Sequence, residues 1–163
     1  MNTYRFHSLL LGIIMISIFS QCTNRVYIPN QLNVNMRGNL MFVTLSINDK
    51  KGVFLVDTGA NISLIDFNQA RGYKFQYFKD ESHGTIRGIG GNDKILVTSH
   101  INVKYGGIPY NGFRFYASDF SGLNTYFEKN GMKILGILGS DFLTKSKATI
   151  NYSARTITLN SYK

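Results

Sequence analysis

A succession of short runs rich in β-branched and aromatic residues is the feature that most restricts the fold of this chain. The runs are LMFVTLSI, VFLV, KILVTSHINVKYG, PYNGFRFYAS, ATINY and TITLN, with glycine, asparagine or aspartate between them. Residues of the first kind favour extended strands, and those of the second favour tight turns. The sequence therefore predicts an all-β fold, a barrel or a sandwich, with hairpin turns at residues 48–52, 106–112 and 152–155.

Helices are expected to be few. Residues 67–72 and a segment that starts near residue 141 carry the only helical patterns, and residues 118–133 show no clear period and are predicted to form a surface loop. A chain of 163 residues with 44% hydrophobic and 17% charged residues suits one globular domain preceded by a leader.

The N-terminal segment has the pattern of a targeting signal. The apolar run SLLLGIIMISIFS, residues 8–20, is shorter than the ~20 residues that a spanning helix needs and suits a signal peptide, predicted over residues 1–22. Cys22, in FSQCTN, resembles the lipidated cysteine of bacterial lipoproteins, although Gln21 stands where a small residue is usual. Plain secretion, an uncleaved anchor and a buried inert cysteine are the alternatives. The protein is accordingly expected in the cell envelope, outside the cytoplasm and anchored to a membrane by lipid, or secreted.

Residues 23–38 are predicted to form a tether, and residues 39–163 the folded domain. The net charge of +9 comes from lysines and arginines that are scattered along the sequence. Scattered cations are not typical of nucleic-acid binding, so no nucleic acid is expected as a partner, and an anionic membrane surface or cell wall is the favoured neighbour.

The stretch FLVDTGANIS places Asp57 directly after an apolar strand. A carboxylate at the tip of a buried strand is costly unless it is paired, hydrogen-bonded or used in chemistry, so Asp57 is a candidate catalytic residue. The alternative is an aspartate that only caps a tight turn.

Three segments, taken together, resemble the retropepsin-like aspartic proteases found in bacteria. They are VDTGA at residues 56–60, RGIGG at residues 87–91, and ILG followed by SDFL at residues 137–143. The resemblance spans roughly residues 40–160, and it implies a closed barrel with a flap hairpin and one short C-terminal helix.

The resemblance also implies a role for each segment. Asp57 would activate water for peptide hydrolysis, Ile89 and Leu138 would line apolar substrate pockets, and no cofactor or metal would be needed. Residues that support the active site would be Thr58, Gly59, Ala60, Ile137, Leu138 and Gly139. The flap, which would bind an extended peptide, would contain Gly88, Ile89, Gly90 and Gly91, although an ordinary glycine-rich turn is the alternative. His83 and His100 lack the spacing of metal ligands.

The chain contains a single D-T-G triplet, which supplies half of such a site. Asp141 is expected in the first turn of a helix with Ser140 as N-cap, rather than as the second catalytic aspartate. Either two chains pair as a homodimer, each contributing Asp57, or the domain is a non-catalytic relative. The rival functions are a monomeric peptide- or ligand-binding module and a structural protein of the envelope.

Overall fold

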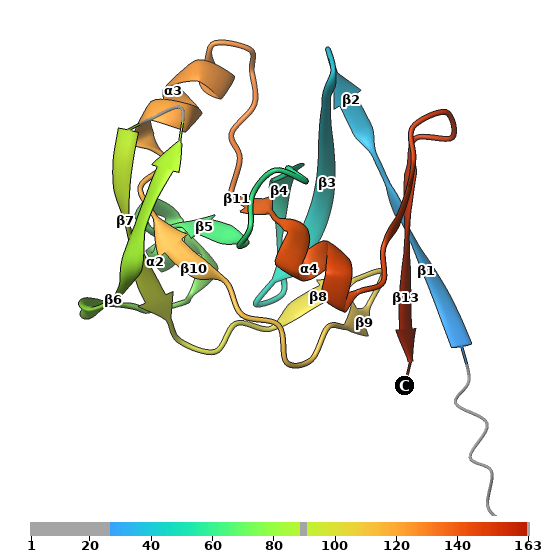
Figure 1. Cartoon of the computed structure of the whole chain (residues 1–163), viewed down its shortest axis with the longest axis horizontal. Coiled ribbons are helices and arrows are strands. Elements are labelled where there is room, and N and C mark those ends of the chain that lie inside the picture. The colour runs from blue at the N-terminus through green and yellow to red at the C-terminus, as the bar shows by residue number, and fades with distance from the viewer. Residues whose placement is uncertain (1–26, 89–90, 163) are drawn as a thin grey trace, which may run out of the picture.

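The computed structural model describes residues 27–88 and 91–162, and these residues form two β-sheets with a few short helices (Figure 1). The strands are β1 (Tyr27–Asn33), β2 (Asn35–Arg37), β3 (Leu40–Ile47), β4 (Lys50–Val56), β5 (Leu64–Asp66), β6 (Tyr77–Gly88), β7 (Gly91–Thr98), β8 (Val103–Tyr105), β9 (Ile108–Pro109), β10 (Tyr116–Ser118), β11 (Gly136–Leu138), β12 (Thr149–Asn151) and β13 (Thr156–Tyr162). The helices are η1 (Phe67–Gln69), α2 (Ala70–Tyr73), α3 (Ser121–Glu128) and α4 (Ser140–Lys145). The prediction of a mostly β fold is confirmed.

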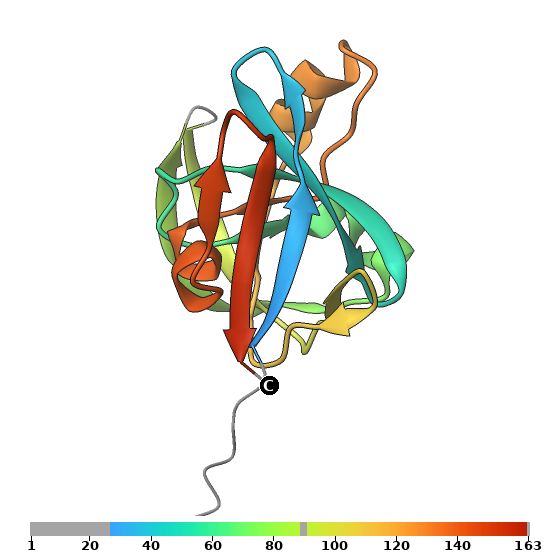
Figure 2. The ribbon, with the colours of Figure 1, turned by 90° about the vertical axis from the view of Figure 1, so that its right-hand side faces the viewer.

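The larger sheet has the order β6-β7-β10-β5-β11-β4-β3-β8-β9, with β2 paired to β3, and the smaller sheet has the order β1-β13-β12. Among the described strands the larger sheet does not return to its starting edge, so the expectation of a closed barrel is wrong. The larger sheet ends at β6 on one side and at β9 on the other, and β1 and β13 pair with each other, from Tyr27↔Tyr162 to Asn33↔Thr156, in the separate smaller sheet. Figure 2 shows this sheet facing the viewer.

The interpretation of residues 23–38 as a tether is wrong for the part that the structure describes. β1 pairs with β13 and β2 pairs with β3, and Leu32 and Val34 are buried in the main apolar core. Tyr27–Arg37 therefore belong to the folded domain. The proposed signal peptide, residues 1–22, and Cys22 lie outside the described residues.

The three predicted hairpin turns are confirmed. Asn48 and Asp49 join β3 to β4 with φ angles of 45° and 68°, a left-handed conformation that asparagine and aspartate tolerate better than most residues. Gly106 and Gly107 join β8 to β9 with φ angles of 55° and 84°. Residues 152–155 join β12 to β13.

Two of the helical segments lie where the sequence predicted helices, and one lies where a loop was predicted. η1 and α2 cover the first predicted segment, and α4 contains Asp141 in its first turn, although its N-cap is Gly139 rather than Ser140. The predicted loop at residues 118–133 instead contains α3, so the fold has more than the one short helix that was expected. Asp119 accepts hydrogen bonds from the backbone N–H and the hydroxyl of Ser121 and so fixes the start of α3.

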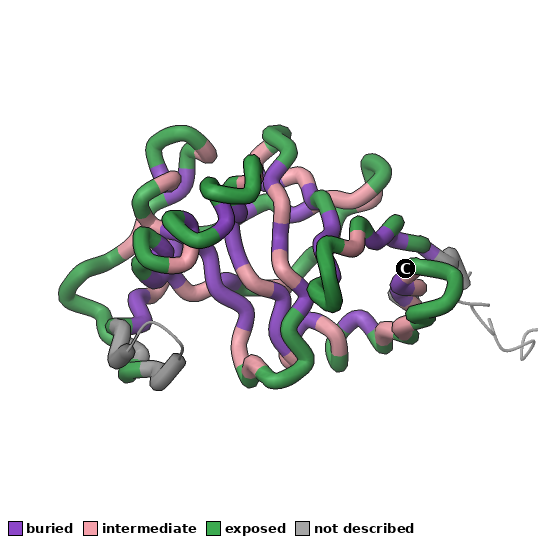
Figure 3. The backbone as a smooth tube through the Cα atoms, turned by 90° about the horizontal axis from the view of Figure 1, so that it is seen from above, coloured by how far each residue is buried: buried purple, intermediate pink, exposed green. Residues whose placement is uncertain are grey.

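Aromatic side chains fill the core beneath the central strands. Phe54 of β4 stacks on Phe115 at a centroid distance of 5.3 Å, and Phe113 packs edge-on against Phe142 of α4 at 5.0 Å. The buried positions follow the strands through the middle of the molecule (Figure 3). Because β4, β11 and α4 all pack on this core, the loops at their ends are held on a rigid base. No helix within residues 27–88 and 91–162 is long and apolar enough to cross a bilayer.

Candidate active site

The backbone of Asp57 is fixed by the two central strands of the larger sheet. β4 pairs in parallel with β11, with Val56 opposite Leu138, and the N–H of Asp57 donates to the carbonyl oxygen of Leu138 at 3.0 Å. The carbonyl oxygen of Asp57 accepts from the N–H of Ala60 at 3.2 Å, which closes a tight turn. Val56 is buried and Asp57 is exposed, so the chain passes from core to surface in one residue.

The carboxylate of Asp57 is oriented by its own loop. One of its oxygens, Oδ1, accepts a hydrogen bond from the N–H of Gly59 at 2.9 Å. A Cβ atom on Gly59 would lie 3.2 Å from that oxygen, so glycine allows the backbone to approach the carboxylate closely. Thr58 and Gly59 are exposed as well. The loop therefore presents a carboxylate, a hydroxyl and a bare backbone outward from the end of the sheet.

Gly139 lets a second turn pack against the Asp57 loop. A Cβ atom at this position would lie 2.7 Å from the carbonyl oxygen of Ile62 and 2.8 Å from that of Ala60, closer than real Cβ contacts allow. The N–H of Ser140 donates to the carbonyl oxygen of Ala60 at 2.8 Å. The structure thus brings the VDTGA and ILG segments together, as the sequence predicted.

Leu138 does not contribute to a substrate pocket. Its side chain is 0% exposed and belongs to the main apolar core, so the expectation that it contacts a peptide is wrong. Leu138 acts instead through its carbonyl oxygen, which holds the N–H of Asp57.

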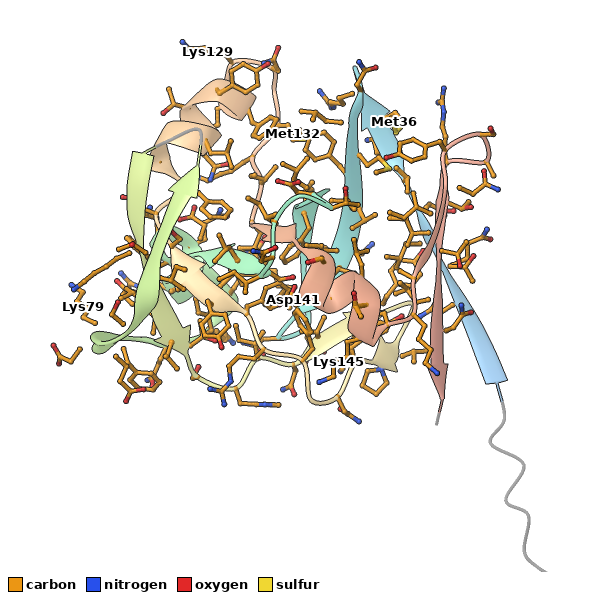
Figure 4. All side chains as sticks on the ribbon, viewed as in Figure 1. Met36, Lys79, Lys129, Met132, Asp141 and Lys145 are labelled. Carbon is orange, nitrogen blue, oxygen red and sulfur yellow. The ribbon has the colours of Figure 1, made fainter. Side chains whose placement is uncertain are left out.

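Asp141, labelled on α4 in Figure 4, is engaged in a structural network. Its carboxylate accepts hydrogen bonds from the hydroxyl of Ser63 at 2.6 Å, the N–H of Ser63 at 3.0 Å and the N–H of Phe142 at 2.7 Å. The same hydroxyl oxygen of Ser63 accepts from the N–H of Gly139 at 2.9 Å. With both oxygens occupied, Asp141 ties α4 to the Asp57 loop, which favours its interpretation as a helix-terminal residue over a catalytic one.

The predicted flap coincides with the hairpin of β6 and β7. Gly88 pairs with Gly91 across its tip, and the register shifts twice between Phe78 and Gly84, which has a φ of 122°. Such irregularities bend and twist a hairpin. The tip points toward the end of the molecule that carries α3 (Figure 1). Ile89 and Gly90 lie outside the described residues.

A buried carboxylate behind the site was missed by reasoning from the sequence. Asp66, 1% exposed at the end of β5, accepts from the N–H of Asn68 at 3.0 Å, the side-chain amide of Gln69 at 3.0 Å and that of Asn124 at 3.1 Å. The only local signal was an aspartate two residues before an asparagine, a pattern typical of capped turns. The network links β5, η1 and α3, so Asp66 has a structural role.

The described part of the chain offers no cluster of metal ligands beside the Asp57 loop. Among the described residues no group of three or more His, Cys, Asp or Glu side chains is placed to hold a metal ion. A hollow of about 580 Å³ lies between α2 and the start of β6, lined in part by Phe67, Arg71 and Tyr77, and it contains none of the predicted site residues.

Comparison with known protein families gives a direct match. The family model described as aspartyl protease matches residues 43–142, which include the Asp57 loop, the β6–β7 hairpin and the start of α4. No curated protein matches the chain.

Solved structures resemble this chain at low sequence identity. The retroviral protease-like domain of Ddi1 from Leishmania major has a TM-score of 0.50 and 19% identity, with 76% of this chain and 90% of that chain covered. The EIAV protease, solved with the inhibitor HBY-793, has a TM-score of 0.49 and 24% identity, over 68% of this chain and 90% of that one. A retropepsin-like aspartic protease from Rickettsia conorii has a TM-score of 0.48 and 15% identity, with 84% of this chain and 96% of that chain covered.

Proposed function

Because this chain belongs to the aspartyl protease family, we propose that it is an aspartic endopeptidase that acts as a homodimer, with Asp57 of each chain in one shared site. The observation that carries the proposal is the Asp57 loop. An exposed carboxylate stands at the tip of a buried central strand, and its one described hydrogen bond is to the N–H of Gly59 in the same loop.

The other carboxylates support the proposal of a second chain. Asp141 has both oxygens engaged by Ser63 and Phe142, and Asp66 is buried in a network of its own. Within the described residues no further carboxylate is joined to the Asp57 loop. A twofold axis beside this loop would bring a second Asp57 next to the first and would cover the exposed Thr58 and Gly59.

The chemistry of such a pair is general acid and base catalysis. Two carboxyl groups in close contact cannot both ionise easily, so they hold one proton between them. The ionised group takes a proton from water as the water oxygen attacks the peptide carbonyl carbon, and the protonated group donates to the carbonyl oxygen. Collapse of the tetrahedral intermediate breaks the C–N bond, and a carboxyl group protonates the departing amine. Cleavage should therefore be greatest at acidic to neutral pH, where the pair retains one proton.

The β6–β7 hairpin is the proposed flap. Its tip glycines, Gly88 and Gly91, leave the backbone uncovered, so N–H and C=O groups can pair with an extended peptide. Closure of the hairpin over the peptide would exclude bulk water from the reacting carbonyl group.

We also propose that the protein resides in the cell envelope. The support is the apolar run at residues 8–20 followed by Cys22, together with the net positive charge. Labelling of cells with a radioactive or clickable fatty acid should mark the chain and should fail to mark Cys22→Ser.

The experiment that tests the proposed activity is peptide cleavage at several protein concentrations. The full chain, solubilised in detergent, is incubated with a diverse peptide library from acidic to neutral pH. We expect cleavage whose rate rises faster than linearly with protein concentration, because monomers must pair before they act. A folded chain that cleaves no peptide at any pH or concentration would favour the binding module instead.

A further inference from the structure

Lysines and arginines that are scattered along the sequence gather at one end of the fold, which we call the basic end. Four segments form it: the β3–β4 turn, α2, the β8–β9 hairpin with the loop after it, and the C-terminal end of α4. The turn and the hairpin lie at the lower edge in both Figure 1 and Figure 2, and Lys145 of α4 is labelled at that edge in Figure 4. The cations of the basic end are Lys50, Lys51, Arg71, Lys74, Lys104, Arg114 and Lys145.

Hydrogen bonds through Asn48 join these segments into one surface. The side-chain amide of Asn48 donates to the carbonyl oxygens of Tyr73 at 2.9 Å and Lys74 at 3.0 Å, at the end of α2. Its side-chain oxygen accepts from the N–H of Asn102, just before β8, at 3.0 Å. Lys145 donates to the carbonyl oxygen of Gly112, which joins α4 to the loop after β9. The cations therefore sit on a connected framework.

The charge of the basic end is largely uncompensated. Its segments, residues 48–51, 70–76, 99–114 and 144–145, contain a single acidic residue, Asp49, which pairs with Lys104 at 2.8 Å. Elsewhere the described charges are more evenly matched. Lys133 pairs with Glu128 at 3.2 Å near α3. β6 carries Asp80 and Glu81 beside its one described lysine.

The described chain also begins at this end. Figures 1 and 2 show the first residues of β1 at the same edge as the β8–β9 hairpin, and Asn30 of β1 donates to the hydroxyl of Tyr110 at 3.0 Å. Cys22 precedes Tyr27 by five residues, and the apolar run ends at Ser20. At 3.3–3.6 Å per residue, five residues span at most about 18 Å. A membrane that held Cys22 or the apolar run would thus lie close to the basic end.

We propose that the basic end docks on a membrane surface that carries anionic lipid headgroups. Clustered lysines and arginines beside a membrane-attached segment are attracted to the negative potential of such a surface. β4 runs from Lys50 at the basic end to Val56 beside Asp57, a distance of roughly 20 Å for a strand of this length. Docking would therefore hold the Asp57 loop away from the lipid and open to peptides. The inference rests on the proposed membrane attachment and is independent of peptidase activity.

Single tryptophans can measure this orientation, because the chain contains no tryptophan. Asn111→Trp places a reporter in an exposed turn at the basic end, and Asn39→Trp places one in the exposed β2–β3 turn at the opposite end. Each full-length variant is incorporated into vesicles of phosphatidylcholine with phosphatidylglycerol that contain a dansyl-labelled headgroup lipid. Energy transfer to dansyl should be at least about threefold stronger from position 111, since the reporters are separated by roughly the length of β4.

Two sets of charge changes and two lipid mixtures make the test specific. Neutralisation at the basic end, with Lys51→Gln, Arg71→Gln and Lys74→Gln, should remove most of the difference between the reporters. The matched control removes three cations from the opposite end, with Arg37→Gln, Lys129→Gln and Lys133→Gln, and should preserve the difference. Vesicles of phosphatidylcholine alone should also reduce it.

The proposal is wrong if the two reporters transfer equally in anionic vesicles, or if the difference survives neutralisation of the basic end or removal of phosphatidylglycerol. A different result would assign the basic end to nucleic acid instead: the two reporters transfer equally, the parent chain binds RNA, and the neutralised variant does not bind RNA. Peptide cleavage, measured on the same variants, reports separately on the active site.

Discussion

Asp57→Asn is expected to lower peptide cleavage by at least about a thousandfold while the chain stays folded. Asparagine cannot ionise, so the pair loses the group that takes the proton from water. Its side-chain oxygen can still accept the hydrogen bond that Asp57 receives from Gly59, and the position is exposed. Stability should therefore change by no more than about 0.5 kcal/mol. Cleavage rates and urea unfolding of both proteins check these expectations.

Asp49→Asn provides the matched control for this change. Asp49 is also an exposed aspartate in a tight turn, but it lies at the basic end, at the start of β4 rather than at its finish. Its replacement removes one ion pair with Lys104 and should leave cleavage unchanged. Comparable loss of cleavage in both variants would show that Asp57 has no special role.

Gly136→Ala is expected to lower the free energy of unfolding by about 3 kcal/mol. A Cβ atom on Gly136 would lie 2.3 Å from the carbonyl oxygen of Leu64 and 2.5 Å from the ring of Phe54. Gly136 is buried in β11, which pairs with β4 on one side and β5 on the other, so neither neighbour can withdraw without breaking the sheet. Because β11 also holds the N–H of Asp57 through Leu138, cleavage should fall with stability.

Gly122→Ala should have the opposite effect on stability. Gly122 lies exposed in α3 with nothing within 4 Å of the added Cβ atom, and alanine favours a helix over glycine by about 0.5–1 kcal/mol. Urea unfolding of the two variants separates steric crowding from a general effect of adding a methyl group. Equal stability of Gly136→Ala and the parent chain would contradict the packing described for β11.

The parts of the fold that could be predicted are those whose cause is local. β3 and β4 contain the apolar runs LMFV and VFLV on either side of the turn at Asn48 and Asp49, and the glycine at position 139 precedes a helix with an acidic first turn. The three site segments carry short patterns that can be recognised without knowing their neighbours. The packing of the ILG segment against the Asp57 loop was predictable because the family pattern specifies it.

The missed elements depend on residues far away in the sequence. β1 is rich in asparagine and glutamine, and its strand conformation is fixed by pairing with β13 at the other end of the chain. α3 has the helical spacing of buried Phe120, Asn124 and Phe127, but a polar residue occupies the middle position. Asn124 is buried because it bonds Asp66 and the backbone of Ile134. No local pattern contains that information.

The grouping of cations at the basic end also depends on contacts between distant parts of the sequence. The cations are scattered along the sequence and form no cluster there, yet Lys51, Arg71, Lys104 and Lys145 come from separate segments that the fold places at one end. Linear clustering is therefore a poor guide to a basic face in a β protein, where neighbouring turns come from distant parts of the chain.

The central claim, that Asp57 from two chains forms one site, is tested most directly by mixing. The wild-type chain, at fixed concentration, is mixed with an equal amount of the folded Asp57→Asn variant. The mixture is held under conditions that let subunits exchange before cleavage is measured. Random pairing puts half of the wild-type chains into mixed dimers, so cleavage should fall to about half, and further with excess variant. Cleavage that stays at the level of the wild-type chain alone, at every ratio and after demonstrated exchange, would contradict the shared site.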